Sequence, residues 1–379
     1  MERKLRVLHI TPDDKFFDGV YTAYENNEDF ENKALFYAPK KNYQFRYIKR
    51  TDVLEIYYKI KDVKERLKRD DYDIVFLHSM PYAFYQFVAC IPDDRKVIWW
   101  GWGYDIYEKL HGLPAIVDIN LYKEKTQFFI DSLKYDFRTV AIKILNFFFG
   151  RIMMSYREEA IKRVDYYQPV VKAEMDLLRR NKFFRAKEFY YRTTAPVLCE
   201  YVERLADGDI ILGNSATATN NHLDVLEVVL RLKQVDQKVI MPLSYGNDKY
   251  KAWLKPHLQK RDILPIYDFL PRDEYFKIVD KCSYAVYGNI RQQAMGNILH
   301  DIANGIKVFL YRDSIAYQNL ISLGYVVFAI EDMSEMSLKT PLTKEQMNQN
   351  NKARMAEYNR RISVYHSFLK EMCEEEPYN

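Results

Sequence analysis

The chain has 379 residues and a mass of 45.5 kDa, enough for two or more domains that each bury a core. This length, with 48% hydrophobic and 29% charged residues, excludes a small disulfide-stapled scaffold and a natively disordered chain. Four well-separated cysteines form no C-x-x-C pair, so we expect free thiols at Cys90, Cys199, Cys282 and Cys373 in a reducing compartment. No export signal opens the sequence, and the uncharged stretch 74–91 reads as a strand, a proline turn and a helix. We expect a cytoplasmic protein.

Positive charge is concentrated in the middle of the chain. Between residues 120 and 195 there are 16 Lys and Arg against 9 Asp and Glu, a net +7, whereas the whole chain carries +4. The same segment contains an apolar run, 140–154, that is too short between its charges to span a bilayer but suits a membrane interface. Two interpretations are open: a core helix with a solvated basic flank, or a surface that binds anionic lipid.

The first half alternates short apolar runs with amphipathic ones. This alternation is typical of βαβ units and a parallel sheet. From residue 123 to about 180 the pattern is helical and basic, with one plausible strand. The predicted strands are 5–10, 34–37, 74–78, 97–100 and 165–171, and a helix is predicted at 53–67.

A second α/β series begins near residue 208. Seven of the twelve glycines fall between Gly208 and Gly324, most of them at the ends of expected elements. We predict strands at 210–212, 239–241, 284–287 and 308–310, and helices at 223–232, 250–259, 298–303 and 344–373. The expected domains are 1–200, with a basic aromatic helical insert at about 120–190; 201–340; and a C-terminal helix, 341–379, that can cross back to the first domain.

Open α/β domains bind ligands outside the carboxyl ends of their strands, so two of them predict Rossmann-like domains that face each other across a cleft. Two strand-to-helix loops of the second domain suit a phosphate. Gly213-Asn-Ser-Ala-Thr-Ala-Thr-Asn-Asn-His222 offers helix N–H groups with the hydroxyls of Ser215 and Thr217. Gly288-Asn-Ile-Arg-Gln-Gln-Ala-Met-Gly296 adds Arg291 as a bidentate partner for a diphosphate. The structural alternatives are an N-capped turn and a solvated loop.

In the first domain, the sequence Trp99-Trp-Gly-Trp-Gly-Tyr-Asp105 follows a strand. The third glycine of a dinucleotide fingerprint is missing, so the three tryptophans suggest a stacking wall for a sugar, with Asp105 at its rim; the alternative is an aromatic core. His78 ends a strand and is a candidate general base, or else a structural histidine. Two D-x-D sequences, 71–73 and 207–209, precede strands, so we expect no catalytic metal and no cofactor.

The loop sequences resemble those of one enzyme family from about residue 74 to 330. The matching elements are Phe76-Leu-His78, Trp100-Gly-Trp-Gly-Tyr-Asp105-Ile-Tyr107, Leu212-Gly-Asn-Ser215 with Asn221-His222, Met241-Pro242 with Tyr245, and Arg291-Gln-Gln293 with Gly296. This set is similar to the TDP-N-acetylfucosamine:lipid II N-acetylfucosaminyltransferases, also called the 4-alpha-L-fucosyltransferases, glycosyltransferase family 56. The resemblance implies a hexosyltransferase of GT-B architecture that uses a nucleotide-diphosphate deoxysugar and a polyprenyl-diphosphate-linked acceptor in surface polysaccharide assembly. It also implies a peripheral location on the inner face of the bacterial inner membrane.

The predicted reaction is therefore a metal-independent glycosyl transfer. Arg291 would stabilise the leaving group, and His78 or Asp105 would take the proton of the acceptor hydroxyl. Trp100, Gly101, Trp102 and Gly103 would bind the acceptor, and an anionic membrane surface is an expected partner, whereas nucleic acid is not. The alternatives are a nucleotide-sugar epimerase of the same layout and a polyanion-binding protein. The expected donor-binding residues are Gly213, Asn214, Ser215, Thr217, Asn221, His222, Pro242, Tyr245, Arg291, Gln292, Gln293, Gly296 and Asn297.

Overall fold

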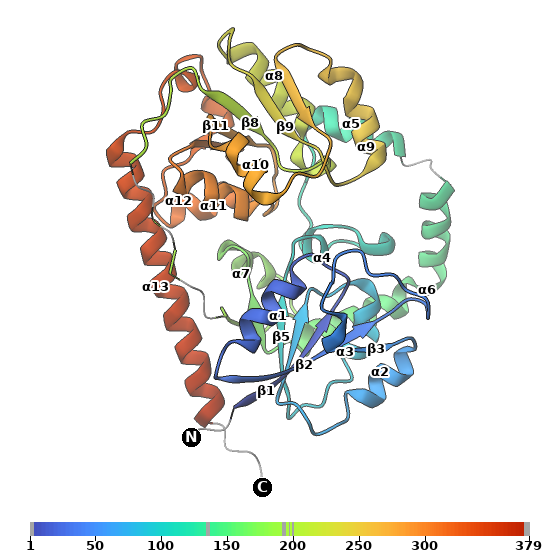
Figure 1. Ribbon diagram of the computed structural model, residues 1–379. Coiled ribbons are helices and arrows are strands. Elements are labelled where there is room, and N and C mark those ends of the chain that lie inside the picture. Colours follow the sequence, from blue (N-terminus) through green and yellow to red (C-terminus); the bar gives the residue numbers. More distant parts are fainter. Residues whose placement is uncertain (1–3, 134–136, 192–194, 197, 199–200, 375–379) are drawn as a thin grey trace. The chain divides into compact units, whose positions relative to one another are not determined.

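The computed structural model describes residues 4–133, 137–191, 195, 196, 198 and 201–374, without the side chains of 112, 137–148 and 272 (Figure 1). The chain divides into two compact units, each with its own parallel sheet. The first unit contains residues 1–118, 140–191 and 364–379, and the second contains 119–139 and 192–363. Residues 119–139, which the sequence analysis placed in an insert of the first domain, thus belong to the second unit.

The first sheet has seven parallel strands in the order β3-β2-β1-β4-β5-β6-β7. Chain order runs outward in one direction from β1 to β3 and in the other from β4 to β7, so the direction of winding changes between β1 and β4. The strands are β1 (Leu5–Thr11), β2 (Phe30–Tyr37), β3 (Leu54–Tyr57), β4 (Ile74–His78), β5 (Lys96–Trp100), β6 (Tyr166–Gln168) and β7 (Lys187–Glu188). The helices of this unit include α1 (Phe17–Glu25), α2 (Ile60–Arg66), α3 (Tyr85–Val88), α4 (Tyr104–Tyr107), α6 (Phe137–Lys162) and α7 (Ala173–Leu178).

One predicted helix of the first unit is wrong in its first half. Residues 54–57, expected within a helix at 53–67, form edge strand β3, and α2 begins only at Ile60. The reason is an ion-pair arrangement that sequence periodicity does not reveal. The fully buried Arg66 side chain donates to Glu55 of β3 at 2.6 and 2.8 Å and to Asp71 at 2.8 Å, which fixes this segment beside the sheet.

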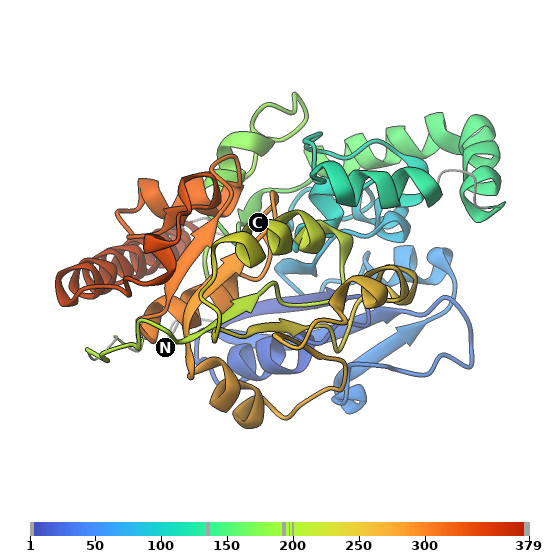
Figure 2. The same cartoon turned by 90° about the horizontal axis from the view of Figure 1, so that it is seen from above.

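The second sheet has six parallel strands in the order β10-β9-β8-β11-β12-β13, with helices on both faces (Figures 1 and 2). Its winding changes direction between β8 and β11. The unpredicted β10 contains Pro265, which an edge strand tolerates. The strands are β8 (Asp209–Leu212), β9 (Val239–Pro242), β10 (Ile263–Ile266), β11 (Cys282–Tyr287), β12 (Lys307–Leu310) and β13 (Phe328–Ala329); the helices include α5 (Glu124–Ser132), α8 (His222–Leu232), α9 (Asp248–Leu254), α10 (Arg272–Val279), α11 (Met295–Ala303) and α12 (Ile315–Ser322).

The chain ends in the long helix α13 (Lys344–Glu374), which is the C-terminal helix that the sequence predicts. Met347 near its start packs with Leu342 in the second unit, while Tyr365 and Phe368 near its end belong to the aromatic core of the first. Among the described residues, no helix is both long enough and apolar enough to cross a membrane. Cys90, Cys282 and Cys373 are free thiols, and Cys199 lies outside the described residues.

Candidate functional site

Each sheet has a topological switch point, where neighbouring strands lead away in opposite directions. In open α/β sheets ligands bind outside the carboxyl ends of the strands at this point. In the second unit the switch point is formed by β8 and β11, so the loops 213–221 and 288–294 lie there. In the first unit it is formed by β1 and β4, so the relevant loops begin at Pro12 and at Ser79.

Gln293 joins the two loops of the second unit in one polar network. Its Nε2 donates to the hydroxyl of Thr217 at 3.0 Å and to Oδ1 of Asn214 at 3.3 Å, and its Oε1 accepts from the hydroxyl of Thr219 at 2.5 Å. The Ser215 and Thr217 hydroxyls are 3.1 Å apart. These contacts bring together the two motifs that the sequence analysis singled out separately.

Several buried polar atoms of these loops have no hydrogen-bond partner among the described residues. They are Oδ1 of Asn220, Oδ1 of Asn289 and Nε2 of Gln292. Buried polar groups in folded proteins are almost always hydrogen-bonded, so such a cluster indicates a place where water or a ligand completes the bonding. The loops therefore have the polar capacity of a binding site as well as its topological position.

Asn221 and His222 shape the loop from inside and are not exposed to a ligand. The Asn221 amide donates to the carbonyls of Leu121 and Gly288 at 3.1 and 2.7 Å. His222 is fully buried, which lowers its pKa to about 3, and its ring contacts the Tyr250 hydroxyl at 3.2 Å. Gly213, with φ of +71°, allows this approach, because a Cβ there would lie 2.8 Å from His222 Nε2.

Arg291 lies in the right loop but is only 9% exposed. Its Nη1 donates to the carbonyl of Gln292 at 2.9 Å. Burial bears directly on the predicted role, because a guanidinium that neutralises a diphosphate must present its N–H groups to that ligand. Arg291 therefore serves as an electrostatic partner only if a ligand reaches it through the loop.

Four further predicted donor residues lie at or near strand and helix ends of this unit. Tyr245 is 37% exposed, and its hydroxyl accepts from the amide of Asn214 at 3.3 Å. Gly296 lies in the first turn of α11 with open space where a Cβ would be, and the Asn297 amide donates to Tyr275 at 3.1 Å. Pro242 ends β9 as a buried residue, so its contribution is to the sheet and not to a ligand.

In the first unit, Asp105 organises the tryptophan loop. It is 1% exposed, and its carboxylate accepts from the backbone N–H of Met80, the indole of Trp99 and the backbone N–H of Trp102, each at 2.9 Å. Desolvation raises its pKa while these three donors lower it. A carboxylate with its oxygens committed in this way holds the loops of β4 and β5 together, which is a positioning role and not the predicted one of a base.

Two of the three tryptophans, Trp100 and Trp102, stack with other rings in this loop, whereas Trp99 is fully buried. Trp102 stacks on Phe16 with ring centroids 4.3 Å apart and planes 6° from parallel, and it also contacts Trp100 at 4.5 Å. Gly101 is required by close packing against Tyr167, and Gly103, with φ of +87°, precedes α4. Phe16 comes from the loop after β1, which the sequence analysis did not connect with this wall.

His78 is fully buried and forms a pair with a second buried histidine. Its Nε2 is 2.9 Å from Nδ1 of His9, and Nε2 of His9 is 3.1 Å from the amide oxygen of Asn32. Desolvation, with the neighbouring ring, lowers the pKa of His78 well below 6.5, and burial lowers that of His9 to about 4. Two neutral rings enclosed by Phe17 and Phe76 are a core element, so His78 is not placed to meet an acceptor.

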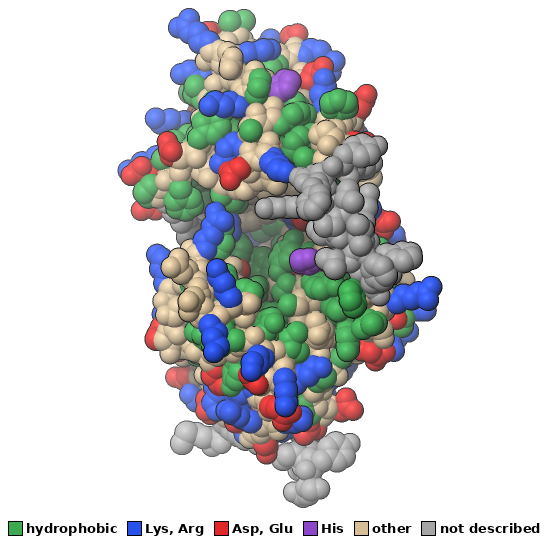
Figure 3. Space-filling model, turned by 90° about the vertical axis from the view of Figure 1, so that its right-hand side faces the viewer, with side chains coloured by type: hydrophobic (Ala, Val, Ile, Leu, Met, Phe, Trp, Pro, Cys, Tyr) green, Lys and Arg blue, Asp and Glu red, His purple; other side chains and the backbone are tan. Residues whose placement is uncertain are grey.

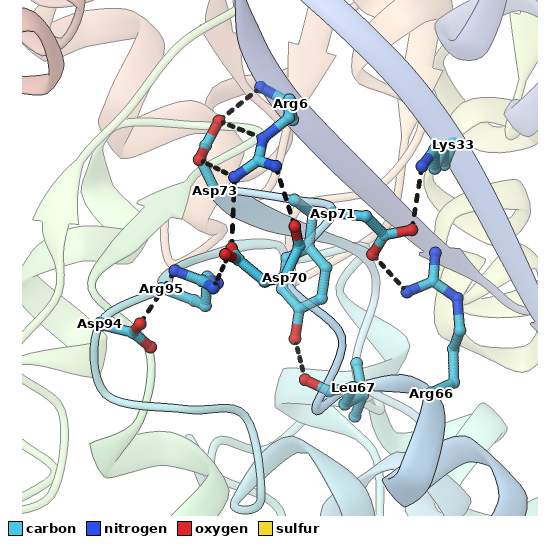
Figure 4. Close-up of polar contacts among 10 residues, drawn as sticks. Arg6, Lys33, Arg66, Leu67, Asp70, Asp71, Asp73, Asp94 and Arg95 are labelled. Atoms are coloured by element: carbon cyan, nitrogen blue, oxygen red, sulfur yellow. Dashed lines mark hydrogen bonds and ion pairs between the residues drawn. The ribbon is translucent and has the colours of Figure 1, made fainter. Parts of the chain in front are cut away.

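The D-x-D sequence at 71–73 is part of an ion-pair cluster at the opposite, amino-terminal edge of the first sheet (Figure 4). Arg6 donates to Asp73 at 2.7 Å, and Lys33 and Arg66 donate to Asp71 at 2.9 and 2.8 Å. Across the described part of the chain, no group of three or more His, Cys, Asp or Glu side chains could hold a metal ion.

Two Rossmann-like units with ligand loops at their switch points define the GT-B class of fold. Known structures with this fold match nearly the whole chain. A lipopolysaccharide outer core galactosyltransferase, WaaB, matches at 8% identity and a TM-score of 0.50 over 97% of this chain and 98% of that one. A sucrose-phosphate synthase from Thermosynechococcus elongatus matches at 7% and 0.53 over 97% of both chains. A putative UDP-N-acetylglucosamine 2-epimerase from Listeria monocytogenes matches at 14% and 0.50 over 97% of both.

Within this fold class, residues 162–371 match the family of 4-alpha-L-fucosyltransferases, glycosyl transferase group 56. The chain belongs to this family and is a glycosyltransferase. The family predicted from the loop sequences and the predicted GT-B-like fold are both confirmed.

Proposed function

We propose that the enzyme transfers a deoxy-amino sugar of the N-acetylfucosamine type from a nucleotide diphosphate, TDP in the first instance, to a polyprenyl-diphosphate-linked oligosaccharide in surface polysaccharide assembly. The family membership supports the reaction class. The observation that carries the proposal is the Gln293 network with its neighbouring unpartnered buried atoms at the switch point of the second unit. Such a loop pair at the carboxyl ends of the strands suits a nucleotide diphosphate.

In this proposal the second unit holds the donor. The Ser215 and Thr217 hydroxyls and the first N–H groups of α11, at Gly296 and Asn297, bind the diphosphate. Arg291 offsets the negative charge that develops on the leaving group. The first unit holds the acceptor against the Trp102 wall, with Asp105 fixing the loop that carries it.

A thermal-shift panel of TDP, UDP, GDP and CMP sugars tests the donor. A ligand that binds only the folded state raises the melting temperature, by an amount that grows with its concentration relative to Kd. We expect a TDP sugar to give the largest shift and the variant Gln293→Ala to lose it. Val235→Ala, a change at a fully exposed residue, is the control. Equal shifts with all four nucleotides, or none, would contradict the donor assignment.

Incubation of the selected donor without acceptor separates transfer from epimerisation. A transferase gives only slow hydrolysis of the nucleotide sugar, whereas an epimerase converts it to a new nucleotide sugar. We expect hydrolysis alone in nuclear magnetic resonance spectra of the mixture. Accumulation of an epimer would contradict the transferase proposal.

We propose further that the protein docks peripherally on anionic lipid through α6. Phe149, Ile152 and Tyr156 repeat at helical spacing and are 56%, 55% and 36% exposed, while Met153 between them is buried. On the face shown in Figure 3, hydrophobic side chains lie among basic and acidic ones. The apolar run 140–148, which also motivated this idea, lies outside the described side chains.

Flotation with phosphatidylcholine vesicles, with and without phosphatidylglycerol, tests this surface. We expect binding that requires the anionic lipid and weakens as salt is added, because surface charges are screened within about 10 Å at 0.1 M ionic strength. The double variant Phe149→Ser with Ile152→Ser should lose binding, whereas Val235→Ser, at the most exposed valine, should not. Binding indifferent to lipid charge would contradict the proposal.

A further inference from the structure

The switch point of the first unit contains a carboxylate that the functional assignment above does not use. Asp14 lies three residues after the end of β1, in the loop that meets the loop after β4. The general rule for open α/β sheets places ligands at this position. Sequence reasoning favoured two other groups as the base, the carboxyl of Asp105 and the imidazole of His78. Both are buried, whereas Asp14 is only partly buried.

The two oxygens of Asp14 have different surroundings. Oδ1 accepts from the backbone N–H of Phe16 at 2.7 Å and of Phe17 at 3.0 Å, which holds the side chain at the start of α1. Among the described residues, the hydrogen-bond contact of Oδ2 is a long one, 3.4 Å, from the hydroxyl of Thr11, whose shorter bond of 2.7 Å goes to the carbonyl of Pro12. One oxygen is therefore fixed and the other is open to a further donor.

The adjacent Asp13 differs from Asp14 in this respect. Its carboxylate accepts from the backbone N–H groups of Arg46, Tyr47 and Ile48 and from the hydroxyl of Tyr43, at 2.7 to 3.1 Å. Both of its oxygens are committed to holding the loop 43–48. Asp13 can therefore serve as a control for Asp14, because it carries the same carboxylate one residue away with both oxygens already hydrogen-bonded.

The aromatic wall lies directly beside Asp14 in the chain. Phe16, two residues on, is 43% exposed and stacks on Trp102. The indole Nε1 of Trp102 is buried and has no partner among the described residues. Flat aromatic faces next to polar groups suit a sugar ring, which presents C–H groups to the face and hydroxyls to its edge. A sugar bound on these aromatic faces would therefore have a hydroxyl near the Asp14 carboxylate.

We propose that Asp14 is the catalytic base that accepts the proton of the attacking acceptor hydroxyl. This inference rests on the proposed function, because it needs a hydroxyl acceptor in the first unit. The hydroxyl proton passes to Oδ2 of Asp14, and the freed oxygen lone pair forms the new bond to the anomeric carbon. The bond from that carbon to the diphosphate oxygen breaks, and its electron pair leaves with the nucleoside diphosphate. A single displacement of this kind inverts the anomeric configuration.

The electrostatics suit this role. The pKa of Asp14 is raised to about 6, mainly by desolvation and to a lesser extent by the charge of Asp13. The hydrogen bonds from the two backbone N–H groups and from Thr11 lower the pKa but do not offset this rise. The other groups that interact with it are Lys15 from its own loop and Tyr104 from α4. The Tyr104 phenol, whose pKa is raised by burial and by nearby carboxylates including Asp14, stays neutral and bonds to Ser79 at 2.7 Å. A base with a pKa near 6 is ionised at neutral pH and still able to take a proton.

The experiment must separate catalysis from the helix-capping bonds of Oδ1. Asp14→Asn keeps an oxygen that can accept from Phe16 and Phe17 and removes only the basic carboxylate. Transfer from TDP-N-acetylfucosamine to a farnesyl-diphosphate-linked disaccharide is measured for the wild type, Asp14→Asn and Asp13→Asn. We expect Asp14→Asn to lower kcat by about 10²- to 10⁴-fold, as for removal of a general base, with an unchanged nucleotide-induced thermal shift.

The pH profile and the product supply two further readouts. The wild type should lose kcat/KM as pH falls through about 6. Asp13→Asn should keep this acidic limb at a lower pH, because the charge of Asp13 contributes to the raised pKa of Asp14, and Asp14→Asn should lack the limb. The product should have inverted anomeric configuration. Near-normal kcat in Asp14→Asn, a retained acidic limb or retained configuration would each overturn the assignment while leaving the transferase proposal intact. No transfer by the wild type would instead contradict the proposed function, and this inference with it.

Discussion

At the scale of single residues, the environment of a side chain decides its role. The sequence placed His78 at the end of a strand and Asp105 in the loop after the next strand. His78 does end β4, and Asp105 lies in the short helix α4, but the sequence could not show that their polar atoms are turned into the protein. Asp105 meets three N–H donors and His78 meets His9. Conversely, Asp14 gave no sequence signal, because one aspartate in a loop resembles any other until its neighbours are known.

The ionised carboxylate of Asp14 should lower the stability of the folded protein. The folded-state pKa of Asp14, about 6, is above the ordinary value of 3.8, so the folded state binds its proton more tightly than the unfolded state. The stabilisation that this bound proton gives the folded state decreases as pH rises from about 4 to 6 and is lost above that. We expect Asp14→Asn to raise the free energy of unfolding by at most about 3 kcal/mol at pH 8 and to have no such effect at pH 4. Urea midpoints at the two pH values measure this, and a gain that is independent of pH would contradict it.

Arg291 tests the donor assignment. We expect Arg291→Ala to lower turnover by roughly 10²-fold or more with the fold intact, as when a transition-state charge contact is removed. Arg261→Ala, in an exposed position before β10 and so at the opposite edge of the sheet, is the matched control. Circular dichroism monitors the fold of both variants. Unchanged turnover in Arg291→Ala would show that this buried guanidinium has a structural role only.

Gly101 shows how tightly the tryptophan wall is packed. A Cβ there would overlap the Tyr167 hydroxyl and lie 2.6 Å from Cδ1 of Ile106. We expect Gly101→Ala to cost about 1–3 kcal/mol, the usual range for overpacking. The Tyr167 hydroxyl is buried and has no hydrogen-bond partner in the described part of the chain, so Tyr167→Phe removes the worst overlap and should restore part of the loss. Denaturant midpoints of the two single variants and the double variant measure this; additive losses would contradict the packing account.

At the scale of elements, buried strands and long helices were predictable and edge elements were not. β4 and α13 were predicted to within a residue because each has a strong pattern: a continuous apolar run, and a long polar helix with spaced apolar residues. β3 and β13 are short strands near the edges of their sheets, so little burial pattern marks them. Strand order, and with it the two switch points, depends on long-range pairing that no local pattern records.

Helix α5 illustrates an element fixed by a distant cap. The carboxylate of Asp224 in α8 accepts from the backbone N–H of Lys125 at 2.8 Å and of Thr126 at 3.1 Å, and from the Thr126 hydroxyl at 2.7 Å. These bonds attach residues 119–139 to the second unit. We expect Asp224→Ala to cost about 1–2 kcal/mol, as for loss of an N-cap. Urea unfolding measures it, with Arg231→Ala, an exposed residue about two turns further along α8, as control; equal effects would contradict the capping role.

At the scale of the whole molecule, the two units should respond to different changes. A nucleotide sugar at 100 times its Kd stabilises the folded state that binds it by about 2.7 kcal/mol, which for a unit of this size raises the melting temperature by roughly 5–10 °C. We expect this shift in the transition of the second unit. Phe368→Ala, which removes an aromatic core side chain, should lower the transition of the first. Scanning calorimetry records both, and a single transition moved by either change would contradict independent units.

The interleaving of the two units along the chain has a consequence for any attempt to divide the gene. The polypeptide passes from one unit to the other after residues 118, 139, 191 and 363. A cut at the predicted boundary near residue 200 would leave α5 on one fragment and its cap, Asp224, on the other, and would part the last turns of α13 from the strands they cover. Neither half-gene encodes a self-sufficient product, so activity from split genes would require both fragments to be expressed together and to reassemble.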